Sequence, residues 1–284
     1  MKLAYHGATS MKSSLEVDIQ ATQRAGFQAL EIWAAKIDDY LESHSVTDMK
    51  SLLDEHGVEP VSLSSIEFIG FQGNEFSKIK DRCAELCAIA EAIGCPTLAL
   101  VPSPTPKAES ETVLDLFFPW EKVVDEYVSV LRTLGQIAEP HGVQLSFEFL
   151  GFAWCSVRTP KGLNEIICKA GEQFGMTFDA CHFFNGGGDI SEIDDIDPSR
   201  ICVFHLDDME DVPKEAITDG HRLLPGEGIL PLDDICQRLK GIGYDGLCCV
   251  ELFRAEYWDW DPFELAKKAY ASAEKVLSPH FTLT

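Results

Sequence analysis

Residues 246–253, GLCCVELF, form an apolar run that is interrupted by a single carboxylate, Glu251. A short and almost continuously apolar run is typical of a parallel strand that is covered on both faces. Three other apolar runs carry one ionisable residue near the same end: Glu148 in GVQLSFEF (142–149), Asp179 in FGMTFDACHFF (174–184) and His205 in RICVFHLDD (200–208). Because the four runs follow one another along the chain, a common cause is indicated.

Short strand-like runs alternate with longer amphipathic runs along the whole sequence. The strand candidates are residues 2–6, 29–33, 60–66, 97–101, 143–149, 175–179, 201–206 and 247–253. Several of the helical patterns between them end in a glycine, which suits the position after a helix. Repeated units of a strand and a helix predict an α/β fold, a (β/α)8 TIM barrel with a single domain over residues 1–284. A doubly wound open sheet is the alternative, but that fold does not need so many units.

The composition limits the kinds of partner. The chain has 284 residues, 45% of them hydrophobic, which is enough for a large buried core. Its 23 basic and 47 acidic residues give a net charge of −24. Nucleic acid and anionic lipid both need a basic surface on the protein, so we expect neither as a partner. A homo-oligomer stays open.

The N-terminal residues and the cysteines predict a cytoplasmic protein. The first ten residues, MKLAYHGATS, contain no apolar stretch long enough for a signal peptide. No apolar run approaches the length of about 18 residues that a membrane span needs. The ten cysteines lie in apolar runs or on predicted helix faces, where they act as small hydrophobic residues. This distribution does not indicate the disulfide framework of a secreted protein.

The four ionisable residues at the strand ends predict a metal site. The C-terminal ends of barrel strands open on one face, so these side chains would meet there. Clustered carboxylates repel one another unless a proton or a cation neutralises them. Three oxygen ligands and one imidazole suit one divalent ion, such as Mn²⁺, Mg²⁺, Co²⁺, Fe²⁺ or Zn²⁺. The expected ligands are Glu148, Asp179, His205 and Glu251; the alternative is that each residue only hydrogen-bonds at its own strand end.

Further side chains are expected around this site. His182 follows Asp179 by three residues and would act as a proton shuttle or substrate donor, or else line the core. Glu31 and Glu67 also lie near strand ends and are expected to be structural or peripheral. Aromatic residues would wall the pocket or pack between barrel and helices: Trp33, Phe68, Trp154, Phe183 and Tyr257.

Two long connections, residues 101–120 and 205–232, follow the fourth and seventh predicted strands. Long loops at this end of a barrel usually build or cover the active site. Arg222 lies in the second connection, within HRLLPGEG, and is expected to bind substrate oxygens. We expect its removal to change kinetics and to leave stability nearly unchanged; a surface ion pair is the alternative.

The sequence resembles the xylose-isomerase-like sugar isomerases and epimerases. The resemblance extends along essentially the whole chain and is carried by IAEPHGVQLSFEFLG (137–151), FDACHFF (178–184), residues 203–234 and VELFRAEYW (250–258). In that family, residues matching the four predicted ligands hold a metal. The matches to Glu148 and Glu251 also serve as acid and base, and a histidine matching His182 lines the site. Endonuclease IV shares the fold, but its additional ligands for three metals are missing here.

The resemblance implies a divalent-metal-dependent isomerase or epimerase of a small keto-sugar or keto-cyclitol. The metal would stabilise an enediolate while one glutamate removes a proton and the other delivers one. No phosphate cradle is evident, which favours a neutral substrate. Three segments depart from the members that act on cyclitols and are expected to contact substrate: the strand ends YHGAT (5–9) and SSIEFIG (64–70) and the proline-rich segment 101–119. Three alternatives remain: a dehydratase or lyase, a hydrolase of the endonuclease IV type, and a non-catalytic polyol-binding protein.

Overall fold

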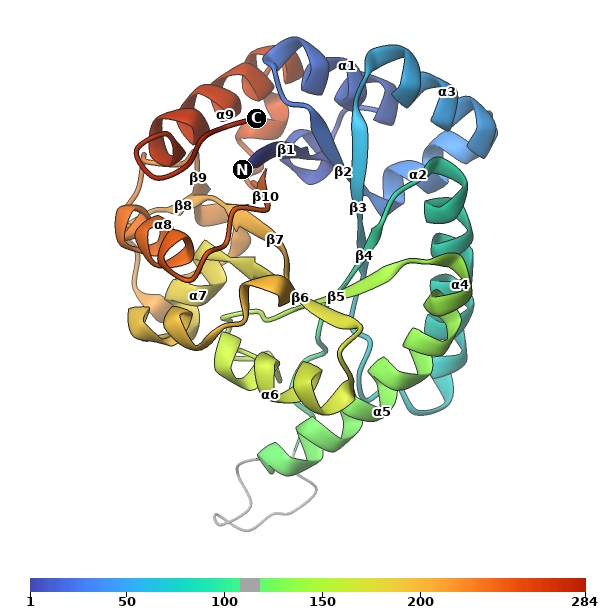
Figure 1. Cartoon of the computed structure of the whole chain (residues 1–284), viewed down its shortest axis with the longest axis vertical. Coiled ribbons are helices and arrows are strands. Elements are labelled where there is room, and N and C mark those ends of the chain that lie inside the picture. The colour runs from blue at the N-terminus through green and yellow to red at the C-terminus, as the bar shows by residue number, and fades with distance from the viewer. Residues whose placement is uncertain (108–117) are drawn as a thin grey trace.

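The computed structural model describes residues 1–107 and 118–284 and shows a closed parallel barrel, as predicted (Figure 1). Around the barrel the strand order is β1-β10-β7-β6-β5-β4-β3-β2, so each strand pairs with its neighbours in the chain and β10 closes against β1. The barrel strands are β1 (Lys2–His6), β2 (Ala29–Trp33), β3 (Glu59–Ile66), β4 (Thr97–Leu100), β5 (Gln144–Glu148), β6 (Phe174–Asp179), β7 (Ile201–Leu206) and β10 (Leu247–Val250).

Helices form a ring around the barrel (Figure 1). Their ends follow the local sequence: the Ser45 hydroxyl accepts from Asp48 N and the Asp48 carboxylate accepts from Ser45 N, so a capping box begins α3. Gly94 ends α4 with φ 79°, a conformation that favours glycine. The helices are α1 (Leu15–Ala25), α2 (Ala34–Leu41), α3 (Val46–His56), α4 (Phe76–Ile93), α5 (Trp120–Ala138), α6 (Pro160–Ala170), α7 (Ala180–Gly186), α8 (Leu232–Gly241) and α9 (Pro262–Leu277).

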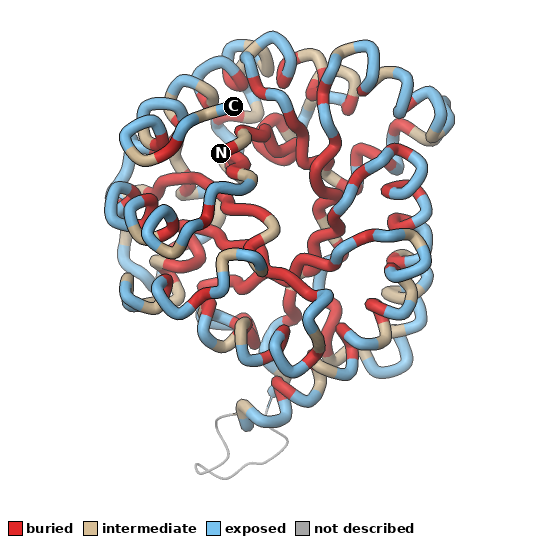
Figure 2. Tube along the Cα trace, in the orientation of Figure 1, coloured by how far each residue is buried: buried red, intermediate tan, exposed pale blue. Residues whose placement is uncertain are grey.

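The buried residues follow the barrel strands and the inner faces of the helices (Figure 2). A small separate cluster consists of short side chains from four strands and one buried thiol: Ala4, Ala29, Val61, Val203 and Cys249. The large core contains Leu, Ile and Phe side chains of both strands and helices. All ten cysteines are free, as the sequence indicates for a chain without a disulfide framework.

Three details differ from the prediction or lie beyond it. The last predicted strand, 247–253, ends at Val250, so Glu251 lies just outside it. A two-stranded antiparallel sheet, β8 (Asp208–Met209) and β9 (Arg222–Leu223), organises the long connection after β7 and was not predicted. In the other long connection, residues 108–117 lie outside the described residues. No helix in the described ranges is long and apolar enough to cross a membrane.

Candidate metal centre

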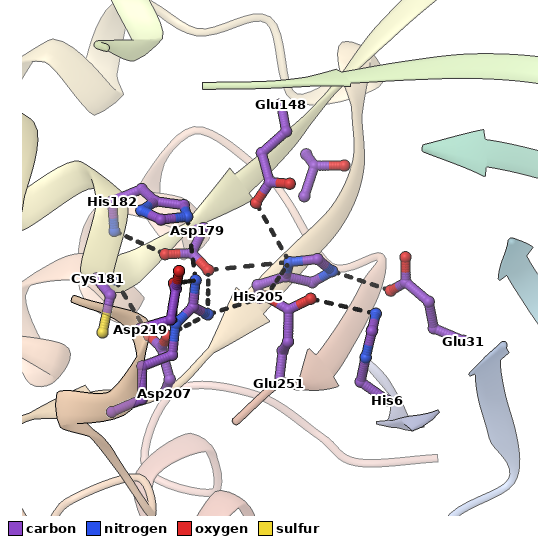
Figure 3. Close-up of polar contacts among 12 residues, drawn as sticks. His6, Glu31, Glu148, Asp179, Cys181, His182, His205, Asp207, Asp219 and Glu251 are labelled. Carbon is purple, nitrogen blue, oxygen red and sulfur yellow. Dashed lines mark hydrogen bonds and ion pairs between the residues drawn. The ribbon is translucent and has the colours of Figure 1, made fainter. Parts of the chain in front are cut away.

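The four predicted ligands lie together at the mouth of the barrel (Figure 3). Glu148 and Asp179 are the last residues of β5 and β6. His205 lies one residue before the end of β7, and Glu251 directly follows β10. One ligand atom of each side chain lies within 4.8 Å of the others, and all four side chains are buried. Parallel strands therefore bring together residues that are far apart in the sequence.

The donor atoms fit a divalent cation. His205 Nδ1 lies 3.2 Å from Glu251 Oε2, 3.6 Å from Glu148 Oε1 and 3.9 Å from Asp179 Oδ2. In the described part of the chain, His205 Nδ1 and Glu148 Oε1 are buried without a hydrogen-bond partner. A buried polar atom without a partner costs about 1–3 kcal/mol. Three carboxylate oxygens and one imidazole nitrogen form a donor set that a divalent ion would satisfy.

Glu31 orients the imidazole of His205. Its Oε2 lies 2.9 Å from His205 Nε2, so Nε2 carries a hydrogen, and once Nδ1 is deprotonated its lone pair would face the other three predicted ligands. A carboxylate behind a histidine ligand fixes both the tautomer and the ring orientation. Glu31 was expected to be structural or peripheral to the pocket; it does not line the cavity and instead contacts His205 from behind. Glu67, for which the same was expected, lines the cavity.

Asp179 connects the group of predicted ligands to His182. Its Oδ1 accepts a hydrogen bond from His182 N at 2.7 Å and so caps the first turn of α7. The His182 ring is buried, and the ring of Phe152 meets it edge-on with centroids 5.0 Å apart. Burial lowers the pKa of His182, so the ring is neutral near pH 7.

Arg222 is a buried cation among the acids of the site. Its Nη1 lies 2.7 Å from Asp179 Oδ2, 2.7 Å from Asp207 Oδ2 and 2.9 Å from Glu251 Oε2. Its Nη2 lies 3.0 Å from His182 Nε2. The guanidinium is 1% exposed, which rules out a surface ion pair. The expectation that Arg222 contributes little to stability assumed a surface position and does not fit this burial, because removal of Arg222 would leave buried carboxylates without a counter-charge.

The loop that carries Arg222 is held by Asp208. The Asp208 carboxylate accepts four backbone N–H groups, from Met209, Gly226, Gly228 and Leu230. Gly228 permits this close approach, since a Cβ there would lie 2.2 Å from Met209 O. The carboxylate thus fixes the loop from which Arg222 extends into the site.

A cavity of about 180 Å³ opens onto the ligands. Glu148, Glu251, His182 and Arg222 all line it. Of the expected aromatic residues, three line the cavity: Trp33, Phe68 and Trp154. Phe183 instead packs on Phe178, and the Tyr257 hydroxyl accepts from Leu224 N. A larger cavity of about 530 Å³ lies between α5 and α6 and shares no lining residue with the ligand group.

Sequence reasoning did not single out two buried residues of this site, Asp207 and His6. Asp207 accepts from Cys181 N at 3.1 Å and pairs with Arg222. It lies two residues after His205, and this spacing puts both side chains on one face of an extended chain, which is a usable signal. The His6 ring, at the end of β1, lies 3.1 Å from Glu251.

The comparisons with known proteins agree with this architecture. Residues 19–276 match the family model described as xylose isomerase-like TIM barrel. An inosose isomerase of Halalkalibacterium halodurans is 32% identical over 100% of this chain and 99% of its own. The inosose isomerase of Bacillus subtilis is 30% identical, with 100% of both chains covered.

Solved structures of related proteins show the same barrel fold. The structure of IOLI protein with a binding zinc atom has a TM-score of 0.91 and 30% identity, covering 99% of this chain and 100% of that chain. A D-psicose 3-epimerase of Clostridium cellulolyticum H10 has a TM-score of 0.72 at 16% identity, covers 98% of this chain and 99% of that chain, and shares the fold. The closed barrel, the buried ligand group and the full-length similarity together show that this chain belongs to the xylose isomerase-like TIM barrel family.

Proposed function

We propose that this protein is a divalent-metal-dependent isomerase or epimerase of a small, neutral keto-sugar or keto-cyclitol of the inosose type. The observation that carries the proposal is the pair of buried glutamates, Glu148 and Glu251, which border one cavity and share one group of metal-ligating atoms. The full-length relatives named inosose isomerase support the substrate class.

The residues that would hold the metal are Glu148, Asp179, His205 and Glu251. When bound, a divalent ion polarises a substrate carbonyl and so acidifies the neighbouring C–H group. The two glutamates would then move the proton, one as base and the other as acid. Their carboxylates flank the Nδ1 atom of His205, so both reach the same point in the cavity.

Without a bound metal, the environments of the two glutamates differ. Burial raises the pKa of Glu148 to about 8, which favours its protonated form near neutral pH. Burial also opposes ionisation of Glu251, but His205 and His6 hold its pKa well below the usual value. A bound divalent ion would favour the ionised form of both carboxylates, so this difference in pKa belongs to the metal-free protein and does not decide which glutamate is the acid and which the base.

Substrate recognition would come from donors and aromatic surfaces around the same cavity. Arg222 and His182 both line it. Each guanidinium nitrogen of Arg222 already contacts a carboxylate or His182, so Arg222 would attract substrate oxygens through its charge and not through a free N–H group. The rim also carries two acids, Glu67 and Asp219. Burial, followed by the charge of Asp219, raises the pKa of Glu67. Among the described residues, Arg222 is the one Lys or Arg that lines this cavity, and it is already paired with carboxylates, so a phosphate group would find no free cation there. Such a rim disfavours phosphorylated substrates, so we assign a neutral polyol.

The proposal extends to the setting of the enzyme. We propose a single domain over residues 1–284 and a cytoplasmic location, without a nucleic-acid or membrane partner. The net charge of −24 supports the absence of partners that need a basic surface. A homo-oligomer is compatible with the proposal.

The test is a substrate panel. Metal-free protein is loaded in turn with Zn²⁺, Mn²⁺, Co²⁺ and Mg²⁺ and incubated with inososes and ketohexoses, and products are identified by NMR and mass spectrometry. We expect a product of unchanged mass that differs in the position of the carbonyl or in one stereocentre. A product lighter by one water would instead identify a dehydratase, and no turnover of any panel member with any metal would contradict the proposal.

A further inference from the structure

His6 is a buried histidine that no step described above uses. The end of β1 was expected to contact substrate, but His6 is fully buried and the lining of the cavity consists of other residues. β1 pairs with β10 in parallel, with Tyr5 opposite Val250. This register places His6 beside Glu251 (Figure 3), and Glu251 lines the cavity whereas His6 does not.

The tautomer of His6 follows from its backbone contact. Its Nδ1 accepts a hydrogen bond from Ala8 N at 3.0 Å, which begins the 3-10 turn after β1. A neutral imidazole has one N–H group, so the hydrogen lies on Nε2. Nε2 lies 3.1 Å from Glu251 Oε1 and has no regular hydrogen bond among the described residues, so this close polar contact is its interaction.

The ring of His6 is held in this orientation by its neighbours. Its centroid lies 6.0 Å from that of Trp33 and 6.2 Å from that of Phe253. The ring of His205 meets it edge-on at 5.7 Å. A buried ring with packed faces and one anchored nitrogen is fixed in space, and so is the direction of its N–H group.

The same tautomer excludes a second metal at this position. His6, Glu31 and His205 bring donor atoms within 4.8 Å of one another. However, Nε2 of a neutral His6 carries a hydrogen and has no lone pair for a metal. The Nε2 atom of His205 is also engaged, since it is hydrogen-bonded to Glu31. The polar contact with Glu251 is the arrangement that remains.

We propose that His6 is a positioning residue for Glu251. The His6 Nε2 atom lies 3.1 Å from Oε1, so the buried ring limits the rotation of the carboxylate, whose Oε2 lies 3.2 Å from His205 Nδ1. His6 thus restricts Glu251 from behind by close contact, whereas Glu31 restricts His205 by a hydrogen bond. Partners behind a metal ligand raise affinity by reducing the freedom of that ligand. The metal-binding part of this inference needs only the ligand group, whereas its consequence for turnover rests on the proposed function.

The test compares three substitutions that distinguish the contact of His6 Nδ1 with Ala8 from the contact of His6 Nε2 with Glu251. His6→Phe removes both contacts. His6→Asn keeps an acceptor for Ala8 N but is too short to reach Glu251, and His6→Gln keeps a donor near the position of Nε2. Tyr5→Phe is the matched control, since Tyr5 is a buried residue of the same strand whose ring packs on Phe27.

The first readout is Zn²⁺ affinity of the metal-free protein, measured in competition with a chromophoric chelator. We expect His6→Phe and His6→Asn to bind zinc about 10–100-fold more weakly, the range typical of lost partners behind ligands. His6→Gln should recover most of the affinity, and Tyr5→Phe should match wild type. The second readout is turnover at saturating zinc, where kcat should fall in the same order with little change in KM.

Two outcomes would overturn the role of His6. One is wild-type zinc affinity in both His6→Phe and His6→Asn. The other is an equal loss in all three variants that parallels a loss of thermal stability, which would indicate packing alone. If His6→Phe does not fold, the Asn and Gln variants decide between these results. If the zinc affinities follow the predicted order but the wild-type protein turns over no substrate, the proposed function is contradicted and the role of His6 in metal binding stands.

Discussion

At the scale of single residues, the site is organised by contacts behind the groups that face the cavity. Arg222 offsets the charges of Asp179, Asp207 and Glu251 in the interior. The sequence indicated Arg222 as a site residue because it lies in a long loop of an acidic protein. It could not indicate burial, because the partners of Arg222 come from other elements and only the fold brings them together.

Substitution of Arg222 by alanine should destabilise the metal-free protein by about 3–5 kcal/mol, the usual cost of breaking a buried ion pair on one side. Bound Zn²⁺ should reduce this loss, because the ion supplies the positive charge that the carboxylates have lost. Urea unfolding with and without zinc measures both values.

The matched control for this prediction is Arg238→Ala. Arg238 forms an exposed ion pair with Asp194 on the surface of α8. Its removal should change stability by less than about 1 kcal/mol. Equal effects of the two substitutions would mean that the buried cluster around Arg222 does not need its cation.

At the scale of elements, the eight barrel strands were predictable because each is a compact apolar run followed by a helical pattern. β3, for example, was predicted at 60–66 and observed at Glu59–Ile66. The sheet of β8 and β9 escaped prediction, since each strand has two residues and their pairing spans the loop between them. The acceptor role of Asp208 is a further feature of that folded loop, and it depends on backbone geometry that no local pattern encodes.

Asp208→Asn should loosen this loop and reduce turnover. The asparagine keeps one acceptor oxygen but turns the other into an N–H₂ group. At whichever position the N–H₂ group takes, it would face backbone N–H groups. At the Oδ2 position, for example, these belong to Gly226 and Gly228. A buried donor left without an acceptor costs about 1–3 kcal/mol. Hydrogen exchange should become faster in residues 224–230.

Asp211→Asn serves as the control, because Asp211 is exposed in the same connection. It should leave both hydrogen exchange and turnover unchanged. Wild-type exchange protection in Asp208→Asn would show that other contacts hold the loop.

At the scale of the whole molecule, the barrel concentrates acidic groups at one end of a chain that is already strongly negative. The sequence predicted this convergence from four strand ends, since barrel topology alone brings them together. The protonation states of the clustered acids and histidines could not be predicted from the sequence, because they depend on burial and on distances of a few ångströms. These protonation states make the stability of the protein depend on pH.

The contribution of Glu148 to the stability of the metal-free protein should fall as pH rises from about 5 to 8. Burial raises the pKa of Glu148 to about 8, above the usual value of 4.5. Between these values the folded state holds a proton that the unfolded state has released, so folding loses up to about 1.4 kcal/mol per pH unit from this group. Urea unfolding at pH 5.5, 6.5 and 7.5 measures the slope.

Two comparisons isolate the contribution of Glu148. Glu148→Gln should flatten the slope, since the amide does not titrate. Zinc should also flatten it, because the ion favours the ionised carboxylate in the folded state. A slope that is the same in Glu148→Gln as in wild type would assign the effect to other groups.

The most direct test of the account is solvent exchange by the zinc-loaded enzyme and its Glu148→Gln/Glu251→Gln double variant in D₂O, followed by NMR with the best substrate of the panel. The account predicts isomerised product that carries deuterium beside the carbonyl in wild type. In the double variant it predicts a loss of turnover of at least about 10²–10⁴-fold, the usual cost of losing one positioned acid or base. Product formed at an undiminished rate by the zinc-loaded double variant would contradict it.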